Sequence, residues 1–297
     1  MSNFPRMYSV ASLGFNWKMV FLLFATFGGL TNLSLGDEAG DLEGLKKSLT
    51  LYASFDKGID ADVALGDSRL HCAESMKTIN DAKPGLGQSN RFERVDGEGV
   101  RGGGALRFKK KGESFPFFQG DKNVKYSGKD WKGTVSFFLK VDPSKNLAYN
   151  DPIQVTDANY KESAIWVDFT KDKPRKFRLA VISDLQPNGK RTVKENRVMP
   201  AKTLPFSEDK WTQVTITFSA LNTDHGEAHM YFDGELQCSV TDVDDPVTID
   251  LEKFRVHIGL SYIGLFDELV VFDRSLSESE VKALHELQGG AGDLVGN

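Results

Sequence analysis

Segments in which every second residue is apolar recur from about residue 130 onward, and this period constrains the fold more than any other feature. Side chains at i, i+2 and i+4 of a strand share one face. Four segments have such a face: Val135, Phe137, Leu139 and Val141; Ile165, Val167 and Phe169; Phe177, Leu179 and Val181; Val214, Ile216 and Phe218. Turn pairs such as Asp142-Pro143 and Asp233-Gly234 separate the segments. The pattern predicts an all-β fold, a two-sheet antiparallel β-sandwich rather than βαβ units.

One short helix is expected near the C-terminus. Ser277 and Glu280 have the spacing of a capping box, in which each side chain bonds the other residue's backbone amide. Val281, Leu284 and Leu287 follow at helical spacing, and Gly289-Gly290 ends the helix. We expect residues 289–297 to be a flexible tail.

Four segments, in order, resemble laminin-G-like, concanavalin A-type jelly-roll domains. They are Gly-Ala-Leu-Arg-Phe at 104–108, Thr-Val-Ser-Phe-Phe-Leu-Lys at 134–140, Trp-Thr-Gln-Val-Thr-Ile-Thr-Phe at 211–218 with Met-Tyr-Phe-Asp-Gly at 230–234, and the strand-to-helix run 266–288. The resemblance implies a concanavalin A-like jelly roll over residues 49–288, with one sheet forming a concave wall. Function is less constrained than fold, because sites of many kinds are grafted on such folds.

The N-terminus has the pattern of a secretory signal peptide. Arg6 and Lys18 precede an apolar stretch at 19–30, and Ser34-Leu-Gly36 supplies small residues for cleavage between Gly36 and Asp37. The alternative is an uncleaved anchor, for which the uncharged stretch 19–36 is marginal in length. Residues 37–48 are polar and contain glycine, and we interpret them as a linker. The location expected for the mature protein is secreted, periplasmic or on the cell surface.

Charge and cysteine content narrow the partners. The formal net charge is −5, which argues against nucleic acid and anionic membranes as partners. Beyond the N-terminal segment, no membrane association is expected. In an oxidising compartment, Cys72 and Cys238 either form a disulfide or remain two separate buried thiols.

The outward faces of the central strands carry the candidate ligand site. Trp166, Phe138, Asp168, Lys140 and Arg178 alternate with the core positions of their strands. If these strands form the concave wall, the aromatic rings stack on a sugar and the charged groups bind its hydroxyls. The alternative is that Trp166 packs beneath a loop of the long segment 57–103.

A structural Ca²⁺ site is implied by the resemblance, because related jelly rolls often bind this ion away from the ligand cleft. The matching positions are Asp56, Gly104 through its backbone carbonyl, and Asp267. Hard oxygen ligands suit Ca²⁺. The alternative is that Asp56 caps a turn and Asp267 bonds loop amides.

No catalytic motif is found. Retaining glycosidases of this superfold carry paired acids on one strand, in the patterns E-x-D-x-x-E or E-x-D-x-E, and the sequence has neither. The sequence therefore predicts a non-enzymatic secreted module that binds an extracellular glycan. Two alternatives stay open: an adhesion or scaffold domain that binds a surface protein, and an atypical glycan-cleaving enzyme.

Overall fold

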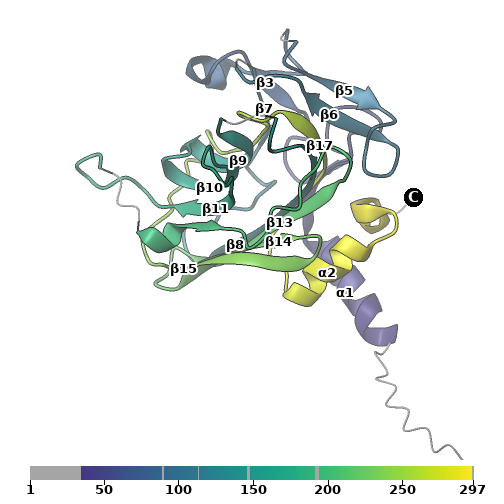
Figure 1. Ribbon diagram of the computed structural model, residues 1–297. Coiled ribbons are helices and arrows are strands. Elements are labelled where there is room, and N and C mark those ends of the chain that lie inside the picture. Colours follow the sequence, from purple (N-terminus) through teal and green to yellow (C-terminus); the bar gives the residue numbers. More distant parts are fainter. Residues whose placement is uncertain (1–34, 89, 113, 146–147, 191–193, 296–297) are drawn as a thin grey trace, which may run out of the picture.

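The computed structural model describes residues 35–88, 90–112, 114–145, 148–190 and 194–295. Within these ranges the strands form two antiparallel sheets, one of nine strands and one of eight (Figure 1). The two sheets enclose one large apolar core. The predicted β-sandwich is confirmed.

The nine-stranded sheet brings together strands from both ends of the chain. Its order is β15 (Glu235–Val243), β14 (Gly226–Phe232), β13 (Thr212–Leu221), β8 (Trp131–Lys140), β17 (Gly264–Phe272), β1 (Leu49–Ala53) and β2 (Val63–Ala64). β6 (Gly104–Phe108) also pairs with β17, and β5 (Phe92–Asp96) pairs with β6.

The eight-stranded sheet carries the outer face that matters for function. Its order is β12 (Val198–Pro200), β11 (Phe177–Ile182), β10 (Glu162–Phe169), β9 (Asn150–Asn159), β16 (Arg255–Ile258), β7 (Phe115–Gln119), β3 (His71–Ala73) and β4 (Lys83–Pro84). A short 3₁₀ helix, η2 (Glu195–Arg197), precedes β12.

The alternating apolar positions form the core between the sheets. All members of the four predicted faces are buried in one cluster. Each fully buried aliphatic or aromatic side chain contributes roughly 1.5–3 kcal/mol by leaving water. The period-2 pattern therefore predicted correctly which side of each strand is buried.

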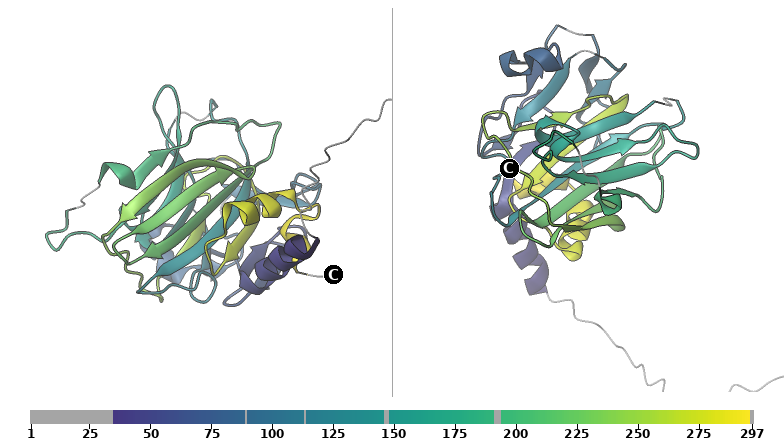
Figure 2. Two further views of the ribbon diagram at one scale, coloured as in Figure 1. Left: turned by 90° about the horizontal axis from the view of Figure 1, so that it is seen from below. Right: turned by 90° about the vertical axis from the view of Figure 1, so that its left-hand side faces the viewer.

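Helices cover the outer face of the nine-stranded sheet. They are α1 (Leu35–Ser48), α2 (Glu278–Glu286) and the 3₁₀ helix η3 (Gly290–Leu294). In Figure 2, left, α2 lies across the strands of this sheet, with α1 at its side. A second apolar cluster fills the interface and includes Leu45, Tyr231, Val281, Leu284 and Leu294. The predicted capping box is present: the Glu280 amide donates to Ser277 Oγ (3.3 Å), and the Ser277 amide donates to the Glu280 carboxylate (2.9 Å).

The structure differs from the sequence expectation at both ends of the domain. Residues 37–48, expected as a linker, belong to helix α1, which buries Leu45 against the sheet. Residues 289–297 were expected to be a flexible tail, but η3 buries Ala291 and Leu294 in the same cluster. Packing on an apolar sheet face stabilises both segments, although their glycines lower helix propensity.

Of the two alternatives for Cys72 and Cys238, the structure has two separate buried thiols and no disulfide between them. Cys72 lies on β3, near one end of the eight-stranded sheet. Cys238 lies on β15 in the other sheet, where its Sγ contacts the carbonyl of Met199 on β12, at the opposite end of the eight-stranded sheet. Burial raises the pKa of the Cys238 thiol to about 12, so it stays protonated and inert.

The predicted signal peptide lies almost entirely outside the described residues, which begin at Leu35. Among the helices of the described ranges, none combines the length and apolar character needed to cross a membrane.

Leucine-to-alanine substitutions at one buried and one exposed site test whether the C-terminal segment is packed. Leu294→Ala should destabilise the protein by about 2–4 kcal/mol, because it leaves a cavity beneath η3. Leu251→Ala should cost less than about 0.5 kcal/mol, because Leu251 is 46% exposed whereas Leu294 is 5% exposed. Urea unfolding of both variants measures the difference, and equal stabilities would mean that the C-terminal segment is not packed.

Candidate functional site

One row of side chains crosses the outer face of the eight-stranded sheet. The strand register pairs Trp166 of β10 with Ala180 of β11 and with Gln154 of β9. The row continues from Gln154 to His257 of β16 and Phe117 of β7. Paired residues of neighbouring antiparallel strands point to the same face. These side chains therefore form one wall, which faces away from the core.

The chain's own early segment covers one end of this wall. The 3₁₀ helix η1 (Met76–Asp81) lies there, and Arg255 of β16 donates to the side-chain oxygen of Asn80 (2.7 Å). The rings of Phe117 and His257 are buried at this end, with centroids 5.5 Å apart. The segment 57–103 thus closes the wall over β16 and β7. The sequence alternative placed Trp166 beneath this segment, but Trp166 lies at the other end, where no residue of 57–103 lines the pocket.

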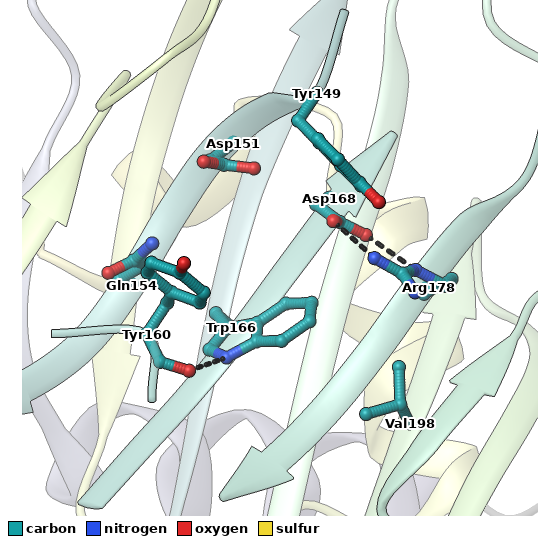
Figure 3. A pocket seen from close by; sticks show the side chains of 8 residues that line it. All are labelled: Tyr149, Asp151, Gln154, Tyr160, Trp166, Asp168, Arg178 and Val198. Carbon is teal, nitrogen blue, oxygen red and sulfur yellow. Dashed lines mark hydrogen bonds and ion pairs between the residues drawn. The ribbon is translucent and has the colours of Figure 1, made fainter. Parts of the chain in front are cut away.

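The other end of the wall, over β9, β10 and β11, is hollowed into a pocket of about 390 Å³ (Figure 3). This volume lies within the usual range for small-molecule sites. The pocket is lined by Tyr149, Asp151, Gln154, Tyr160, Trp166, Asp168, Arg178 and Val198. Three of the five residues predicted to bind the ligand, Trp166, Asp168 and Arg178, therefore meet in one pocket.

The other two predicted ligand residues, Phe138 and Lys140, lie elsewhere. Both belong to β8, a strand of the nine-stranded sheet. Phe138 is buried on the far side of the sandwich, where the Arg101 guanidinium lies 5.9 Å from its ring centroid. Alternation shows which side of a strand faces outward, but the outward faces of the two sheets point in opposite directions. The expected five-residue site is wrong in this respect.

Trp166 is a floor of the pocket rather than an open platform. Its indole N–H donates to the backbone carbonyl of Tyr160 (2.9 Å), and only 6% of the side chain is exposed. This bond holds the β9–β10 hairpin against the ring (Figure 3). Trp166 therefore shapes the pocket, while the more accessible aromatic surface belongs to other residues.

Two exposed tyrosines line the pocket. Among the described residues, five large hydrophobic side chains are exposed, and two of them, Tyr149 and Tyr160, are found here at 43% and 47% exposure. Exposed aromatic rings gathered at a pocket are typical of ligand contact. The sequence analysis did not identify either tyrosine, because both lie in connections beside β9, where apolar and polar residues do not alternate. The one available signal was an aromatic residue in an otherwise polar connection.

The charged groups of the pocket differ in their partners. Arg178 donates through Nε and one Nη to the two oxygens of Asp168, at 2.9 and 2.6 Å. The same guanidinium lies 5.7 Å from the Trp166 ring and 5.9 Å from the Tyr149 ring. Burial raises the pKa of Asp168, although Arg178 opposes this shift. The pair is bidentate and planar, a geometry that fixes both side chains.

Asp151 has no such partner. Its carboxylate makes no hydrogen bond or ion pair with any residue in the described part of the chain. Burial, followed by the negative charge of Asp168, raises its pKa from 3.8 to about 6. The pocket therefore contains one neutralised carboxylate and one that lacks a donor.

The three residues predicted to bind a metal do come together, on another part of the molecule. The Gly104 amide donates to Asp56 Oδ1 (2.8 Å), and the Val100 amide donates to Asp267 Oδ2 (2.7 Å). A methyl group on Gly99 would lie 2.4 Å from the Gly104 carbonyl oxygen and 2.9 Å from Asp267 Oδ2, so both oxygens border the same point. Oxygen atoms of Asp267 and Gly104 therefore lie close together, and the Gly104 amide links Asp56 to them.

Several carboxylates lie near one another at this second site. Asp267 is 1% exposed, and burial together with the nearby Glu268 and Asp56 carboxylates raises its pKa to about 8. Arg94 supplies one positive group, donating to the carbonyls of Phe55 (2.6 Å) and Asp56. No cluster of three or more His, Cys, Asp or Glu side chains arranged for a metal occurs within the described ranges. Hydrogen bonds to loop amides, the alternative role, account for the contacts present.

Solved structures of similar fold include binding domains of bacterial toxins. The ligand-binding domain of botulinum neurotoxin serotype D, solved with N-acetylneuraminic acid, is 13% identical, with 84% of this chain and 53% of that chain covered and a TM-score of 0.55. The binding domain of Paraclostridial Mosquitocidal Protein 1 is 15% identical, with 81% and 52% covered and a TM-score of 0.54. The chain thus spans about half the length of these domains, and at such identities the likeness shows the fold alone.

A further structure, domain 4 of an extracellular arabinanase from Geobacillus stearothermophilus solved with arabinotriose, is 17% identical, with 80% of this chain and 98% of that chain covered and a TM-score of 0.48. No curated protein sequence matches the chain. A laminin G family model, described as the concanavalin A-like lectin/glucanases superfamily, matches residues 123–282, more than half of the chain. The chain therefore belongs to the concanavalin A-like lectin/glucanase superfamily.

Proposed function

We propose that the protein is a non-catalytic module that binds carbohydrate in the pocket over β9, β10 and β11. The observation that carries the proposal is the joint presence of two exposed tyrosines and a set of polar side chains in one hollow of the outer face. A sugar needs both, since its ring has apolar C–H surface and its hydroxyls need donors and acceptors. The shared fold of a toxin domain solved with a sugar supports this direction.

Each pocket residue has a defined role in the proposed complex. Tyr149 and Tyr160 pack against the apolar surface of the sugar ring, above the floor made by Trp166. Asp151 accepts hydrogen bonds from hydroxyls, and the Gln154 amide both donates and accepts. Asp168 holds Arg178 in place, so that the remaining guanidinium N–H groups meet the ligand without a large entropy cost.

The predicted signal peptide would export the protein, and we therefore propose an extracellular glycan as the partner. Export itself stays a prediction. The alternative, a surface-protein partner, is less well supported. A protein-binding site of that kind would be expected to have a broad exposed apolar face without a groove. Here the exposed aromatics line a hollow that is too small to hold a protein surface.

A glycan-cleaving enzyme is the second candidate, and one observation favours it. Asp151, with a pKa of about 6, lies near a second carboxylate, Asp168, which is tied to arginine. Two acids in different environments are the usual equipment of an acid–base pair. Release of reducing ends from a polysaccharide panel, abolished by Asp151→Asn, would favour the enzyme over the binding module.

We also propose that Ca²⁺ binds between Asp56, the Gly104 carbonyl and Asp267. The ion would neutralise the Asp56 and Asp267 carboxylates, which lie close enough to raise the pKa of Asp267. Its role would be structural, joining the segment after β1 to β17.

Binding should depend on the exposed tyrosines. Tyr160→Ala and Tyr149→Ala should each weaken binding to a glycan identified on an array by at least about fivefold, because each removes aromatic contact with the sugar. Lys140→Ala should not change binding, because Lys140 lies on the other sheet. Trp166→Ala is a less decisive variant, since the loss of a buried tryptophan costs about 3–5 kcal/mol in stability alone. Calorimetric titration of Tyr160→Ala, Tyr149→Ala and Lys140→Ala measures the three affinities, and undiminished affinity in both tyrosine variants would exclude this pocket as the binding site.

Calcium should raise the melting temperature of the wild-type protein. At a free Ca²⁺ concentration 100 times the dissociation constant, the native state gains about 2.7 kcal/mol by mass action. EDTA should lower the melting temperature of the calcium-bound wild type. It should leave the melting temperature of Asp267→Asn unchanged, because this variant lacks one of the proposed carboxylate ligands. Asp130→Asn changes an exposed acid elsewhere and should behave as the wild type. If EDTA leaves the melting temperature of all three proteins unchanged, the site holds no calcium.

Asp151 should reduce the stability of the ligand-free protein. A pKa raised from 3.8 to about 6 means that the folded state holds its proton more tightly than the unfolded state. Stability is therefore lost as the pH rises from about 4 to about 6, by up to about 3 kcal/mol at about 1.4 kcal/mol per pKa unit.

Asp151→Asn should accordingly raise the free energy of unfolding at pH 7 and have little effect below pH 4. The exposed Asp172→Asn should leave stability nearly unchanged at both pH values. Urea unfolding at pH 4 and pH 7 provides the measurement, and a destabilised Asp151→Asn at pH 7 would contradict the account of Asp151 as an unpaired charge.

A further inference from the structure

The charge pattern of the pocket limits which sugars can enter it. Asp151 comes from β9, and its carboxylate has no donor among the described residues. It lines the same pocket as Asp168 and Tyr149 (Figure 3). A ligand in the pocket therefore meets a hydrogen-bond acceptor that the protein itself leaves unsatisfied.

The charges around Asp151 do not cancel its effect. Asp168 of β10 repels a negative charge, while Lys111, between β6 and β7, and Arg178 of β11 attract one. No ion pair within 4.0 Å joins Asp151 to either base in the described part of the chain. The effect of burial outweighs both bases, since the pKa of Asp151 is raised rather than lowered.

The charge of Arg178 is already balanced by Asp168, which uses one of the two donor edges of the guanidinium. Acid recognition by arginine relies on two parallel N–H groups directed at the two oxygens. Asp168 already occupies such a pair on Arg178, through Nε and one Nη. An anionic sugar would therefore meet a paired arginine and an unpaired carboxylate.

We propose that the pocket selects carbohydrate by charge, accepting sugars without a negative charge and rejecting those with carboxylate or sulfate groups, with Asp151 as the specificity-determining residue. The inference rests on the proposed function of the pocket. Hydroxyl or ammonium groups of an accepted sugar donate to Asp151 and supply its missing partner. An acidic group at the same place brings like charges together in a partly desolvated site, which weakens binding on the order of tenfold or more.

Charge selection would give this protein a different sugar preference from one of the domains that share its fold. The botulinum neurotoxin D domain was solved with N-acetylneuraminic acid, a sugar that bears a carboxylate. We expect this chain to bind that sugar poorly, because Asp151 and Asp168 both face the ligand space.

The test compares glycans that differ only in charge. An array carries oligogalacturonates beside their methyl esters and sulfated galactans beside unsulfated ones, together with chitosan oligomers and N-acetylneuraminic acid. Wild type, Asp151→Asn and Asp130→Asn are applied at pH 8 and pH 5. Asp130→Asn removes the same charge from an exposed position next to β8 of the other sheet, so it controls for net charge. Thermal unfolding verifies that each variant is folded.

The expected result is binding to at least one neutral or amino glycan, with its acidic counterpart at least about tenfold weaker. The difference in affinity between neutral and acidic glycans should narrow in Asp151→Asn and not in Asp130→Asn. It should also narrow for the wild type at pH 5, where Asp151 is protonated and the acidic glycans remain charged. Equal binding of neutral and acidic partners, or an affinity difference unchanged in Asp151→Asn, would overturn charge selection while leaving carbohydrate binding in place. Failure to bind any glycan would instead overturn the proposed function itself.

Discussion

The fold depends on the two-faced character of its strands. Every second side chain enters the core between the sheets, so each sheet has a second face that must be covered or left in contact with water. On the nine-stranded sheet, α1, α2 and η3 cover that face with a second apolar cluster. On the eight-stranded sheet, η1 covers only the end over β16 and β7. The pocket lies on the part of the sandwich surface left open by this division.

Local periodicity predicted most of the core but could not predict which strands share a sheet. β8 and β10 have the same alternating pattern, and both of their buried faces were identified correctly. Assignment of a strand to a sheet depends on pairing between distant segments, such as β8 with β13 and β17. That pairing separated Phe138 and Lys140 from Trp166, and it also placed Cys72 and Cys238 at distant ends of the molecule. The face of a strand that a side chain occupies follows from its position along that strand. The sheet to which the strand belongs depends instead on contacts with distant segments.

The segments that the sequence misassigned owe their structure to tertiary contacts. Helix α1 contains glycines and many acidic residues, yet it forms where Leu45 meets an apolar face. Tyr149 and Tyr160 have no periodic context and gain their meaning only because the β8–β9 and β9–β10 connections converge over one pocket. The residues predicted to bind a metal were a different case: resemblance to a family named Asp56, Gly104 and Asp267 together, and the structure brings them to one place, while metal binding itself stays a prediction.

Within the pocket, Asp168 and Asp151 form an internal comparison. Asp168 is buried and Asp151 half-buried near the same arginine, but only Asp168 is hydrogen-bonded to it. A partly buried charge without a partner is costly, and an asparagine of nearly equal size would avoid that cost. Natural chains depart from local consistency mainly at functional sites, where a ligand supplies what the fold lacks. Packing explains Trp166 and ion pairing explains Asp168 without any ligand, but neither explains Asp151. The case for a ligand in this pocket therefore depends more on Asp151 than on the tryptophan that first drew attention to the wall.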